Sequence, residues 1–164
     1  MTKRRLAILA VAMMIAGCGS SARAVAELTI DGAWARSTPP GATQGVVYLR
    51  ITSPIDDALV AARVSHQIAH GVKIHDVMGT AGTSPMANMP QMAEDGEMAM
   101  VPIDSVALQP GVPVVFKPGG KHFILSPLAK PLVSGDHFTL TLWFASGNSR
   151  PVDVLVTDNP PGGG

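Results

Sequence analysis

Residues 137–145 read HFTLTLWFA, and this short stretch decides the fold class. Its bulky apolar side chains alternate with other residues and fall at Phe138, Leu140, Leu142 and Phe144. Successive side chains of a β-strand point to opposite faces, so a period of two is typical of a half-buried strand. We therefore expect a strand here, with one face in the core.

Comparable short stretches recur on the N-terminal side and once after it. They are residues 28–36, 44–52, 58–64, 71–77, 97–101, 112–117, 121–125 and 151–157. Proline- and glycine-rich breaks such as residues 37–41 and 118–120 separate them, and no segment shows a helical period. The sequence predicts an all-β domain of eight or nine strands, an antiparallel Greek-key sandwich or barrel of cupredoxin-like type. The bulky core candidates are Trp34, Phe116, Phe123 and Trp143.

Composition excludes several classes of protein. The chain has 164 residues, zero formal net charge and 4% aromatic residues, which argues against a nucleic-acid partner. A single cysteine excludes an internal disulfide and any CxxC metal or redox motif. With 17 glycines and 14 prolines, a helical bundle is also disfavoured.

The N-terminus has the pattern of an export signal. Residues 3–5 are basic, and residues 6–15 are apolar but shorter than the roughly 20 residues that span a bilayer. The run ends in Ile-Ala-Gly-Cys at Cys18, which resembles a bacterial lipobox. Ordinary cleavage after Ala24 or Ala26 is the alternative, and both versions place the mature protein outside the cytoplasm, in the periplasm.

These features predict a simple domain organisation. We expect a signal peptide over residues 1–18, a tether over 19–27, one domain over 28–158 with a Met-rich loop at 78–97, and a disordered tail over 159–164. A lipid on Cys18 would anchor the domain to the membrane. It would also leave the mature chain without a free thiol, which excludes a cysteine nucleophile, a blue-copper thiolate and a zinc ribbon.

All methionines of the mature chain lie in one 23-residue window. They are Met78, Met86, Met89, Met92, Met98 and Met100. Methionine often fills gaps in a core, but several of these residues fall in a segment that also carries proline and asparagine. Thioethers are good ligands for Cu(I) and poor ligands for hard ions, so the window predicts soft-metal binding.

Two histidines fall on the outer faces of predicted strands. Val72 and Ile74 are expected in the core, which turns His75 outward. In the same way, Phe123 and Leu125 leave His122 on the outer face. We expect both histidines at surface-facing positions as metal ligands. The other three, His66, His70 and His137, are expected to be solvated or hydrogen-bonded.

Four motifs resemble those of a known family. They are AWAR at 33–36 followed by PPG at 39–41, VKIHD at 72–76, MAM at 98–100, and KPGGKH at 117–122. Together they resemble the PCu(A)C family of periplasmic copper chaperones, over residues 31–156. The 21 residues between Met100 and His122 match the family's spacing.

The resemblance implies a cupredoxin-like fold and a function without catalysis. It implies that His75, Met100 and His122 bind Cu(I) as cargo. The recipient would be the CuA centre in subunit II of cytochrome oxidase, reached directly or through a thiol-bearing assembly factor. We expect the carrier to be a monomer.

The sequence departs from the family pattern at two points. Ile124 stands where the family has a final methionine ligand, and 24 residues separate His75 from Met100, an insertion of about 14 residues. We hypothesise that Met98 or a loop thioether, from Met78, Met86, Met89 or Met92, replaces the missing ligand. A three-ligand site of lower affinity, or a site that has lost copper binding, remains the alternative.

Three other functions stay open from the sequence. A periplasmic copper buffer would use the Met-rich loop for several weak sites. The second function is that of a copper enzyme or a cupredoxin-type electron carrier. A blue-copper carrier is excluded, because the mature chain lacks the cysteine ligand that such a site needs. A metal-free lipoprotein that binds other proteins is the third, and Ile124 is the residue that favours it.

Overall fold

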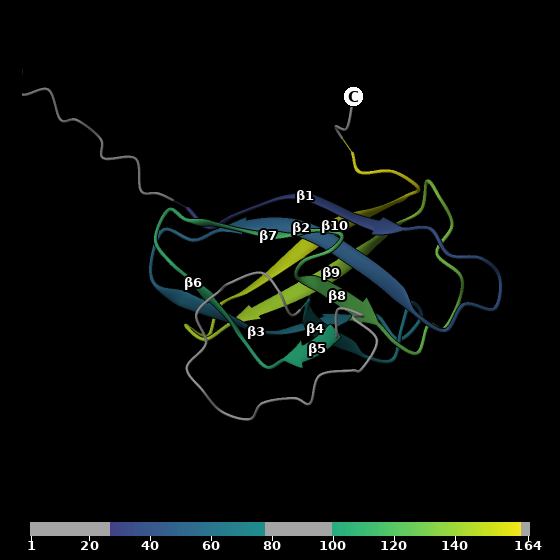
Figure 1. Ribbon diagram of the computed structural model, residues 1–164, viewed down its shortest axis with the longest axis horizontal. Helices are drawn as coiled ribbons and strands as arrows, with labels where there is room; N and C mark the ends of the chain where they lie inside the picture. The colour runs from purple at the N-terminus through teal and green to yellow at the C-terminus, as the bar shows by residue number, and fades with distance from the viewer. Residues whose placement is uncertain (1–26, 78–99, 162–164) are drawn as a thin grey trace, which may run out of the picture.

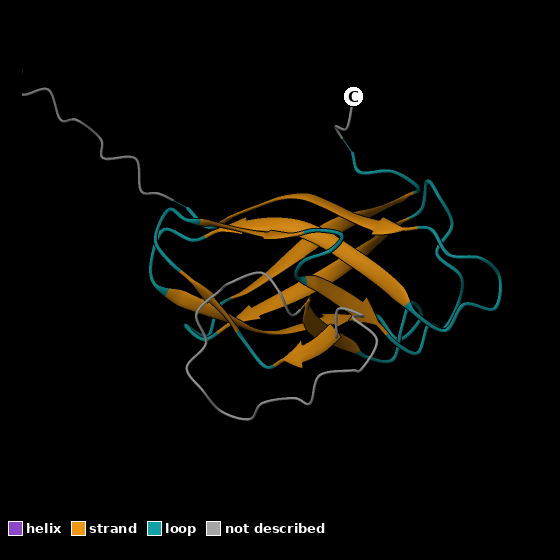
Figure 2. Ribbon diagram, viewed as in Figure 1, coloured by secondary structure: helices purple, strands orange, loops and turns teal. Residues whose placement is uncertain are grey.

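The computed structural model describes residues 27–77 and 100–161. Cys18, the tether up to residue 26, and Met78, Met86, Met89, Met92 and Met98 lie outside the described residues, so the predictions made for them are not tested by the structure. Every regular element of the described residues is a strand, as Figure 2 shows. In these same ranges no helix has the length and apolar character needed to cross a membrane.

The described residues form ten strands. They are β1 (Thr29–Arg36), β2 (Gly45–Thr52), β3 (Asp57–Val64), β4 (Val72–Val77), β5 (Met100–Ile103), β6 (Val106–Leu108), β7 (Pro113–Phe116), β8 (His122–Leu125), β9 (His137–Phe144) and β10 (Ser149–Thr157). Eight correspond to predicted strands with ends shifted by a few residues or less. The predicted 97–101 strand is described from Met100 onward and continues to Ile103, and β6 was not predicted.

The strands form one strongly curved sheet. Their order is β5-β4-β8-β2-β1-β10-β9-β3-β6. β7 also pairs with β2, along residues 49–52, whereas β8 pairs with residues 45–47 of the same strand. β3 also lies against β4, and both line a groove together with β5. The sheet therefore curls into a nearly closed barrel, which confirms the predicted all-β fold (Figure 1).

One strand pair corrects the prediction of a purely antiparallel sheet. β1 and β10 run parallel, with Trp34 opposite Leu155 and Arg36 opposite Thr157. A parallel pair needs a long connection rather than a tight turn, and here nearly the whole domain separates the two strands. The strand directions at this seam depend on the complete topology, so local alternation does not reveal them.

The core confirms the alternation of the opening stretch. Phe138, Leu140, Leu142 and Phe144 are all buried on β9. Phe116 and Phe123 stack inside the barrel with ring centroids 4.5 Å apart. Two of the four bulky core candidates are therefore confirmed as members of the core cluster.

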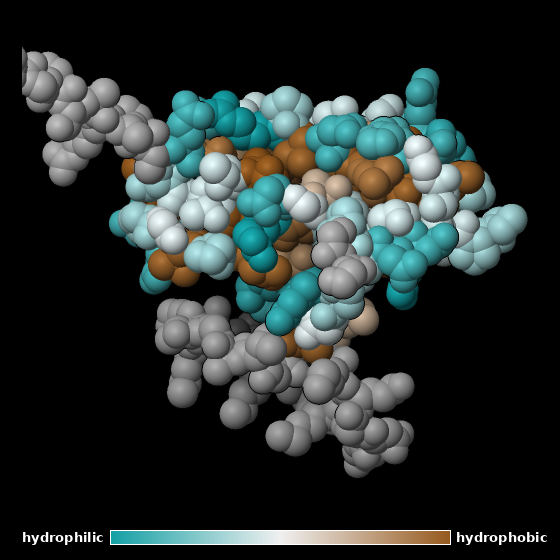
Figure 3. Space-filling view, turned by 90° about the horizontal axis from the view of Figure 1, so that it is seen from above, coloured by the Kyte–Doolittle hydropathy of each residue, from teal (hydrophilic) through white to brown (hydrophobic). Residues whose placement is uncertain are grey.

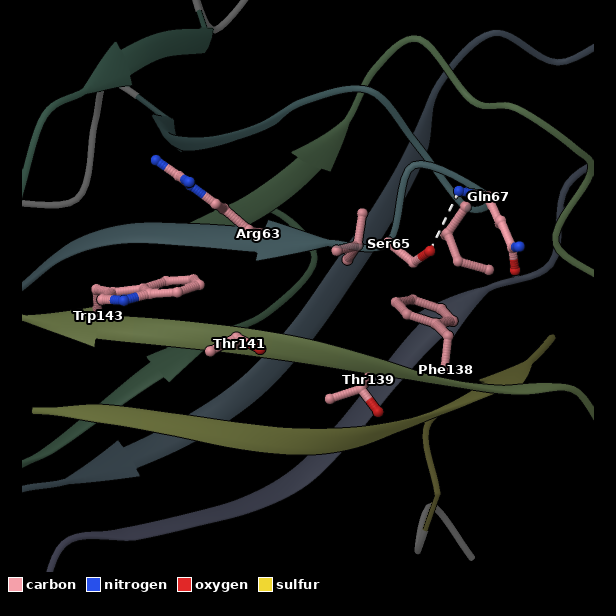
Figure 4. A pocket seen from close by; sticks show the side chains of 9 residues that line it. Arg63, Ser65, Gln67, Phe138, Thr139, Thr141 and Trp143 are labelled. Carbon is pink, nitrogen blue, oxygen red and sulfur yellow. Dashed lines mark hydrogen bonds between the residues drawn. The ribbon is translucent and has the colours of Figure 1, made fainter.

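The two tryptophans occupy other positions. Trp34 is buried, but it packs on Tyr48 with centroids 4.7 Å apart, outside the core cluster. Trp143 is only partly buried, and the Arg63 guanidinium lies 5.5 Å from its ring (Figure 4). Both residues alternate with core residues along their strands, so strand geometry turns them to the outer face.

The outer surface is mixed rather than uniformly polar. Figure 3 shows apolar patches between hydrophilic residues on one face of the molecule. The large apolar residues most exposed in the described ranges are Ile55, Val60, Met100, Val112, Val115 and Val133. Single exposed apolar residues are normal on a soluble surface.

Candidate metal centre

The register of β4 and β8 brings two histidines together. The strands are antiparallel neighbours, and His75 lies directly opposite His122. Their ring centroids are 5.9 Å apart, with an angle of 38° between the ring planes. Directly opposed residues of an antiparallel pair project to the same face, and the adjacent pair, Ile74 and Phe123, belongs to the core. The two histidines therefore share the outer face, as the alternation predicted.

His122 is more buried than the sequence indicated. Only 4% of its surface is exposed. The expectation of a surface-facing ligand is therefore corrected, because the ring lies on the outer face of the sheet but is covered by neighbouring residues. β8 lies between β4 and β2 in the sheet, so neighbours flank His122 on both sides. Burial of this kind restricts the ring to one orientation.

A hydrogen bond fixes the tautomer of His122. Its Nδ1 lies 2.7 Å from the Gly120 carbonyl oxygen, and a carbonyl only accepts, so Nδ1–H is the donor. The Nε2 lone pair is then free, which is the arrangement usual for a metal-binding imidazole. The turn that presents this carbonyl requires Gly119, whose φ of +73° disfavours residues with a side chain.

His75 carries an unsatisfied nitrogen. Its Nδ1 is buried and has no hydrogen-bond partner within the part of the chain that the structure describes. Leaving such a group unpaired costs about 1–3 kcal/mol, and a bound metal ion would remove that cost. The observation fits a ligand whose partner is an ion rather than a protein group.

The surroundings of His75 favour its neutral form. Desolvation is the largest cause that lowers its pKa, and the nearby His122 and Lys73 lower it further. A neutral imidazole has the lone pair that a metal requires. His75 is thus poised to bind an ion in its neutral form.

Met100 lies on the same outer face. Met100 of β5 lies opposite Val77 of β4, and Pro102, two residues later on β5, lies opposite His75. Two residues of strand correspond to about 6.5–7 Å, a separation that a long side chain can reduce. Met100 is 61% exposed, the highest value among the large apolar residues of the described ranges. Its thioether is thus the accessible member of the group.

Ile124 occupies the neighbouring position on β8. It lies opposite Lys73, and both share the outer face with His122. Ile124 is half-buried, and its hydrocarbon side chain has no donor atom for a metal. The departure noted in the sequence therefore falls on the same face as the histidines.

An ion pair holds the two strands together beside the histidines. The Lys121 ammonium lies 2.6 Å from an Asp76 carboxylate oxygen, and both side chains are about a quarter exposed. Asp76 and Lys121 each adjoin one histidine of the pair along the chain. This contact supports the β4–β8 register on which the separation of the rings depends.

The remaining histidines divide into two cases. His137 pairs through Nδ1 with Asp153 at 2.7 Å on the exposed side of β9 and β10, as expected for a hydrogen-bonded surface residue. His66 and His70, however, lie with ring centroids 5.7 Å apart, a pairing the sequence analysis missed. Their spacing of four residues could have predicted this pairing, because residues four apart lie on the same side of a helical turn.

The candidate centre depends on sulfur as well as nitrogen. Among the residues described, no group of three or more His, Cys, Asp or Glu side chains could hold a metal ion. The His75–His122 pair needs further ligands of another kind, and among the described residues Met100 lies on that face and carries a sulfur atom that can supply one. Two imidazoles and a thioether suit Cu(I) better than a hard cation.

Comparison of the sequence with known proteins gives matches that are described as lipoproteins. Residues 80–156 match the family model described as "Putative lipoprotein LpqE-like". A curated relative, "Putative lipoprotein Lxx21020" of Leifsonia xyli subsp. xyli (strain CTCB07), is 24% identical over 94% of this chain and 89% of its own length.

Solved structures with a similar fold are PCuAC domains. The copper-bound PCuAC domain from PmoF2 superposes with a TM-score of 0.61 at 20% identity, covering 83% of this chain and 97% of that domain. The apo PCuAC domain from PmoF1 gives 0.60 at 22% identity, covering 82% and 97%. The CuI-DR1885 structure from Deinococcus radiodurans gives 0.57 at 21% identity, covering 85% and 84%. These matches show that the chain has the fold of the PCuAC domains, as the sequence resemblance implied.

Proposed function

We propose that this chain, which has the fold of the PCuAC domains, is an exported copper chaperone that holds Cu(I) at His75, Met100 and His122. The observation that carries the proposal is the opposed His75–His122 pair: the Nδ1 of His75 has no hydrogen-bond partner among the described residues, and the tautomer of His122 is fixed. The copper-bound PCuAC domain among the structures of similar fold supports the identity of the metal.

The burial of the three side chains differs in a way that suits transfer. His122 is almost fully buried, His75 is half-buried and Met100 is exposed. A partner approaching this face would meet the thioether first, displace that weak ligand, and then exchange the imidazoles one at a time. The protein binds and orients the ion, and no catalytic step is required.

The fourth ligand is proposed to be a thioether from the Met-rich segment. Ile124 provides no donor, so Met98 or one of Met78, Met86, Met89 and Met92 would complete the coordination. If a variant with Met86, Met89 and Met92 all changed to Ala holds Cu(I) as tightly as the parent, those three loop residues are not the replacement. Three-coordinate binding or Met98 would then remain.

Export and anchoring are proposed from the N-terminal sequence together with the comparisons. The family model and the relative both carry the word lipoprotein in their descriptions, and Cys18 follows a lipobox-like run. A lipidated Cys18 in the periplasm would keep the carrier near membrane-bound recipients. The proposed recipient is the CuA centre of cytochrome oxidase, reached directly or through a thiol-bearing assembly factor.

A copper buffer is the second candidate, and the clustering of methionines favours it. A buffer would bind several ions through the Met-rich segment, whereas a chaperone would bind one ion tightly. Anaerobic titration with Cu(I) under a competing chelator distinguishes the two. One equivalent retained against the chelator supports the chaperone, and several weaker equivalents support the buffer.

X-ray absorption of the one-equivalent complex tests the ligand set. We expect two nitrogen ligands of imidazole type together with sulfur scattering, and the sulfur contribution should decrease in Met100→Leu. His137→Ala is the matched control, since that histidine pairs with Asp153 on other strands. A spectrum without imidazole scattering would exclude the proposed site.

A further inference from the structure

A single helical turn connects β3 to β4 and carries the second histidine pair. The amides of Ile68 and Ala69 donate to the Ser65 carbonyl at 2.8 and 3.2 Å. The Ser65 hydroxyl accepts from the Gln67 amide at 3.3 Å, as the dashed line in Figure 4 shows. Residues four apart on such a turn lie on the same side, which explains why His66 and His70 meet.

Backbone contacts hold this turn in place. The His70 amide donates to the Pro127 carbonyl at 3.0 Å, and the Ala69 backbone forms a bridge with Leu128. The Ala129 amide donates to the Ile68 carbonyl at 2.8 Å. Ala69 itself is buried. The turn is therefore anchored to the segment that follows β8, and the two imidazoles project from a fixed base.

The separation of the rings is suitable for sharing one ion. Metal–nitrogen bonds of about 2.0–2.1 Å imply that two imidazoles on one ion have centroids about 4.5–6.5 Å apart. The His66–His70 separation is 5.7 Å, against 5.9 Å for the β4–β8 pair. Both rings are exposed and line a hollow of about 310 Å³, which leaves room for water as further ligands.

Among the described residues, Arg63 is the cationic side chain that lines this hollow, and it lies against an aromatic ring. Arg63 borders the hollow, but its guanidinium lies over the Trp143 ring at 5.5 Å on the adjoining face. Figure 4 draws a different pocket that shares Arg63 and Val64 with this hollow, and there Arg63 and Trp143 lie at one end and Ser65 and Gln67 at the other. The arrangement directs the positive charge away from the turn, where it would otherwise oppose a bound cation.

We infer that His66 and His70 form a second metal site, which binds a divalent ion of the imidazole-preferring class, Cu(II) above the others. Imidazole nitrogen with water oxygen is a ligand set that Cu(II) accepts well, and Cu(II) leads the divalent series in affinity. The site is separate from the β4–β8 pair. His70 precedes His75 by five residues, about 16 Å along extended chain.

The test is a Cu(II) titration of the mature protein carrying His75→Ala and His122→Ala, followed by electron paramagnetic resonance in the presence of glycine as a weak competitor. We expect one Cu(II) with nitrogen hyperfine structure from two imidazoles. Adding His66→Ala or His70→Ala should lower the Cu(II) affinity at least tenfold, whereas His137→Ala should leave it unchanged.

Paramagnetic broadening in nuclear magnetic resonance spectra of the same protein supplies the second readout. Broadening from substoichiometric Cu(II) should begin at residues 65–71, and the unbroadened spectra of the variants show whether each remains folded. Equal Cu(II) affinity with and without the two turn histidines, or broadening centred elsewhere, would overturn the site. Neither result bears on Cu(I) binding by His75, Met100 and His122, so the two proposals fail independently.

Discussion

Two histidine pairs with nearly equal ring separations occupy very different surroundings. The β4–β8 pair has its centroids 5.9 Å apart and includes a ring that is 4% exposed, whereas the pair on the β3–β4 turn is 5.7 Å apart and both of its rings are exposed. Burial and strand register fix the first pair beside a methionine, while one turn of chain presents the second to solvent. The comparison teaches that ring separation alone cannot select a metal, because neighbouring donors and desolvation set the ion that a pair of imidazoles prefers.

Apart from substitutions of the two histidines, the largest loss of Cu(I) affinity is expected for Met100→Leu. The substitution keeps volume and removes sulfur, and the side chain is exposed, so folding should be unaffected. Cu(I) affinity should fall by about tenfold or more, equivalent to about 1.4 kcal/mol, in anaerobic chelator competition. Cu(II) binding by the turn pair should not change. If Cu(I) affinity is also unchanged, the thioether is not a ligand and the contrast between the two pairs loses its chemical basis.

Ile124→Met tests the same comparison by adding a thioether beside the β4–β8 pair instead of removing one. It places a thioether on the face that already carries His122, and it exchanges side chains of similar size. We expect Cu(I) affinity to rise by up to about tenfold, with no change at His66 and His70. In this background, changing Met86, Met89 and Met92 to Ala should have little effect, because the added sulfur now fills the vacancy they are proposed to fill. Ile124→Leu is the matched control.

The pH dependence should set His75 apart. Desolvation, His122 and Lys73 all lower its pKa, so in the metal-free protein it should titrate below the ordinary value of about 6.5. A histidine with a lowered folded-state pKa stabilises the fold above its unfolded pKa, and that contribution decreases as the pH falls toward the folded value.

Titration of the imidazole resonances of the apo-protein measures the effect. Lys73→Gln should raise the pKa of His75, since it removes the positive charge of the lysine that lowers it, and Lys130→Gln is a control elsewhere on the chain. A His75 pKa at or above the ordinary value would contradict the buried, neutral form inferred for this ring. Cu(I) affinity should decrease in acid, because protons compete for both imidazoles.

The smallest effect is expected for the ion pair beside the β4–β8 pair. Asp76→Asn removes the partner of Lys121, and partly exposed pairs contribute about 0.2–1 kcal/mol. Urea denaturation should show a loss within this range, with Cu(I) affinity reduced by less than threefold. A loss of Cu(I) binding as large as that of a ligand variant would mean that Asp76 acts on the metal itself rather than on the strand register.

The sequence predicted the faces of the two ligand strands because a period of two leaves little freedom. Ile74 and Phe123 had to enter the core, so His75 and His122 had to point the other way. The sequence could not reveal how deeply His122 is buried, since that depends on strands β4 and β2 that flank β8 in space.

The missed features share one physical origin, which is contact between distant segments. The parallel seam of β1 and β10 joins the two ends of the domain. The three-residue strand β6 is too short to show alternation, and its pairing with β3 defines it. The meeting of His66 and His70 follows from a turn anchored on residues that come after β8.

The most direct measurement of the central claim is an anaerobic Cu(I) competition titration of four proteins against one chromophoric chelator. They are the parent, His75→Ala, His122→Ala, and a control with both His66 and His70 changed to Ala. We predict that the first two variants lose at least a hundredfold in Cu(I) affinity, while the turn variant matches the parent. Unchanged Cu(I) binding in both His75→Ala and His122→Ala would contradict the account.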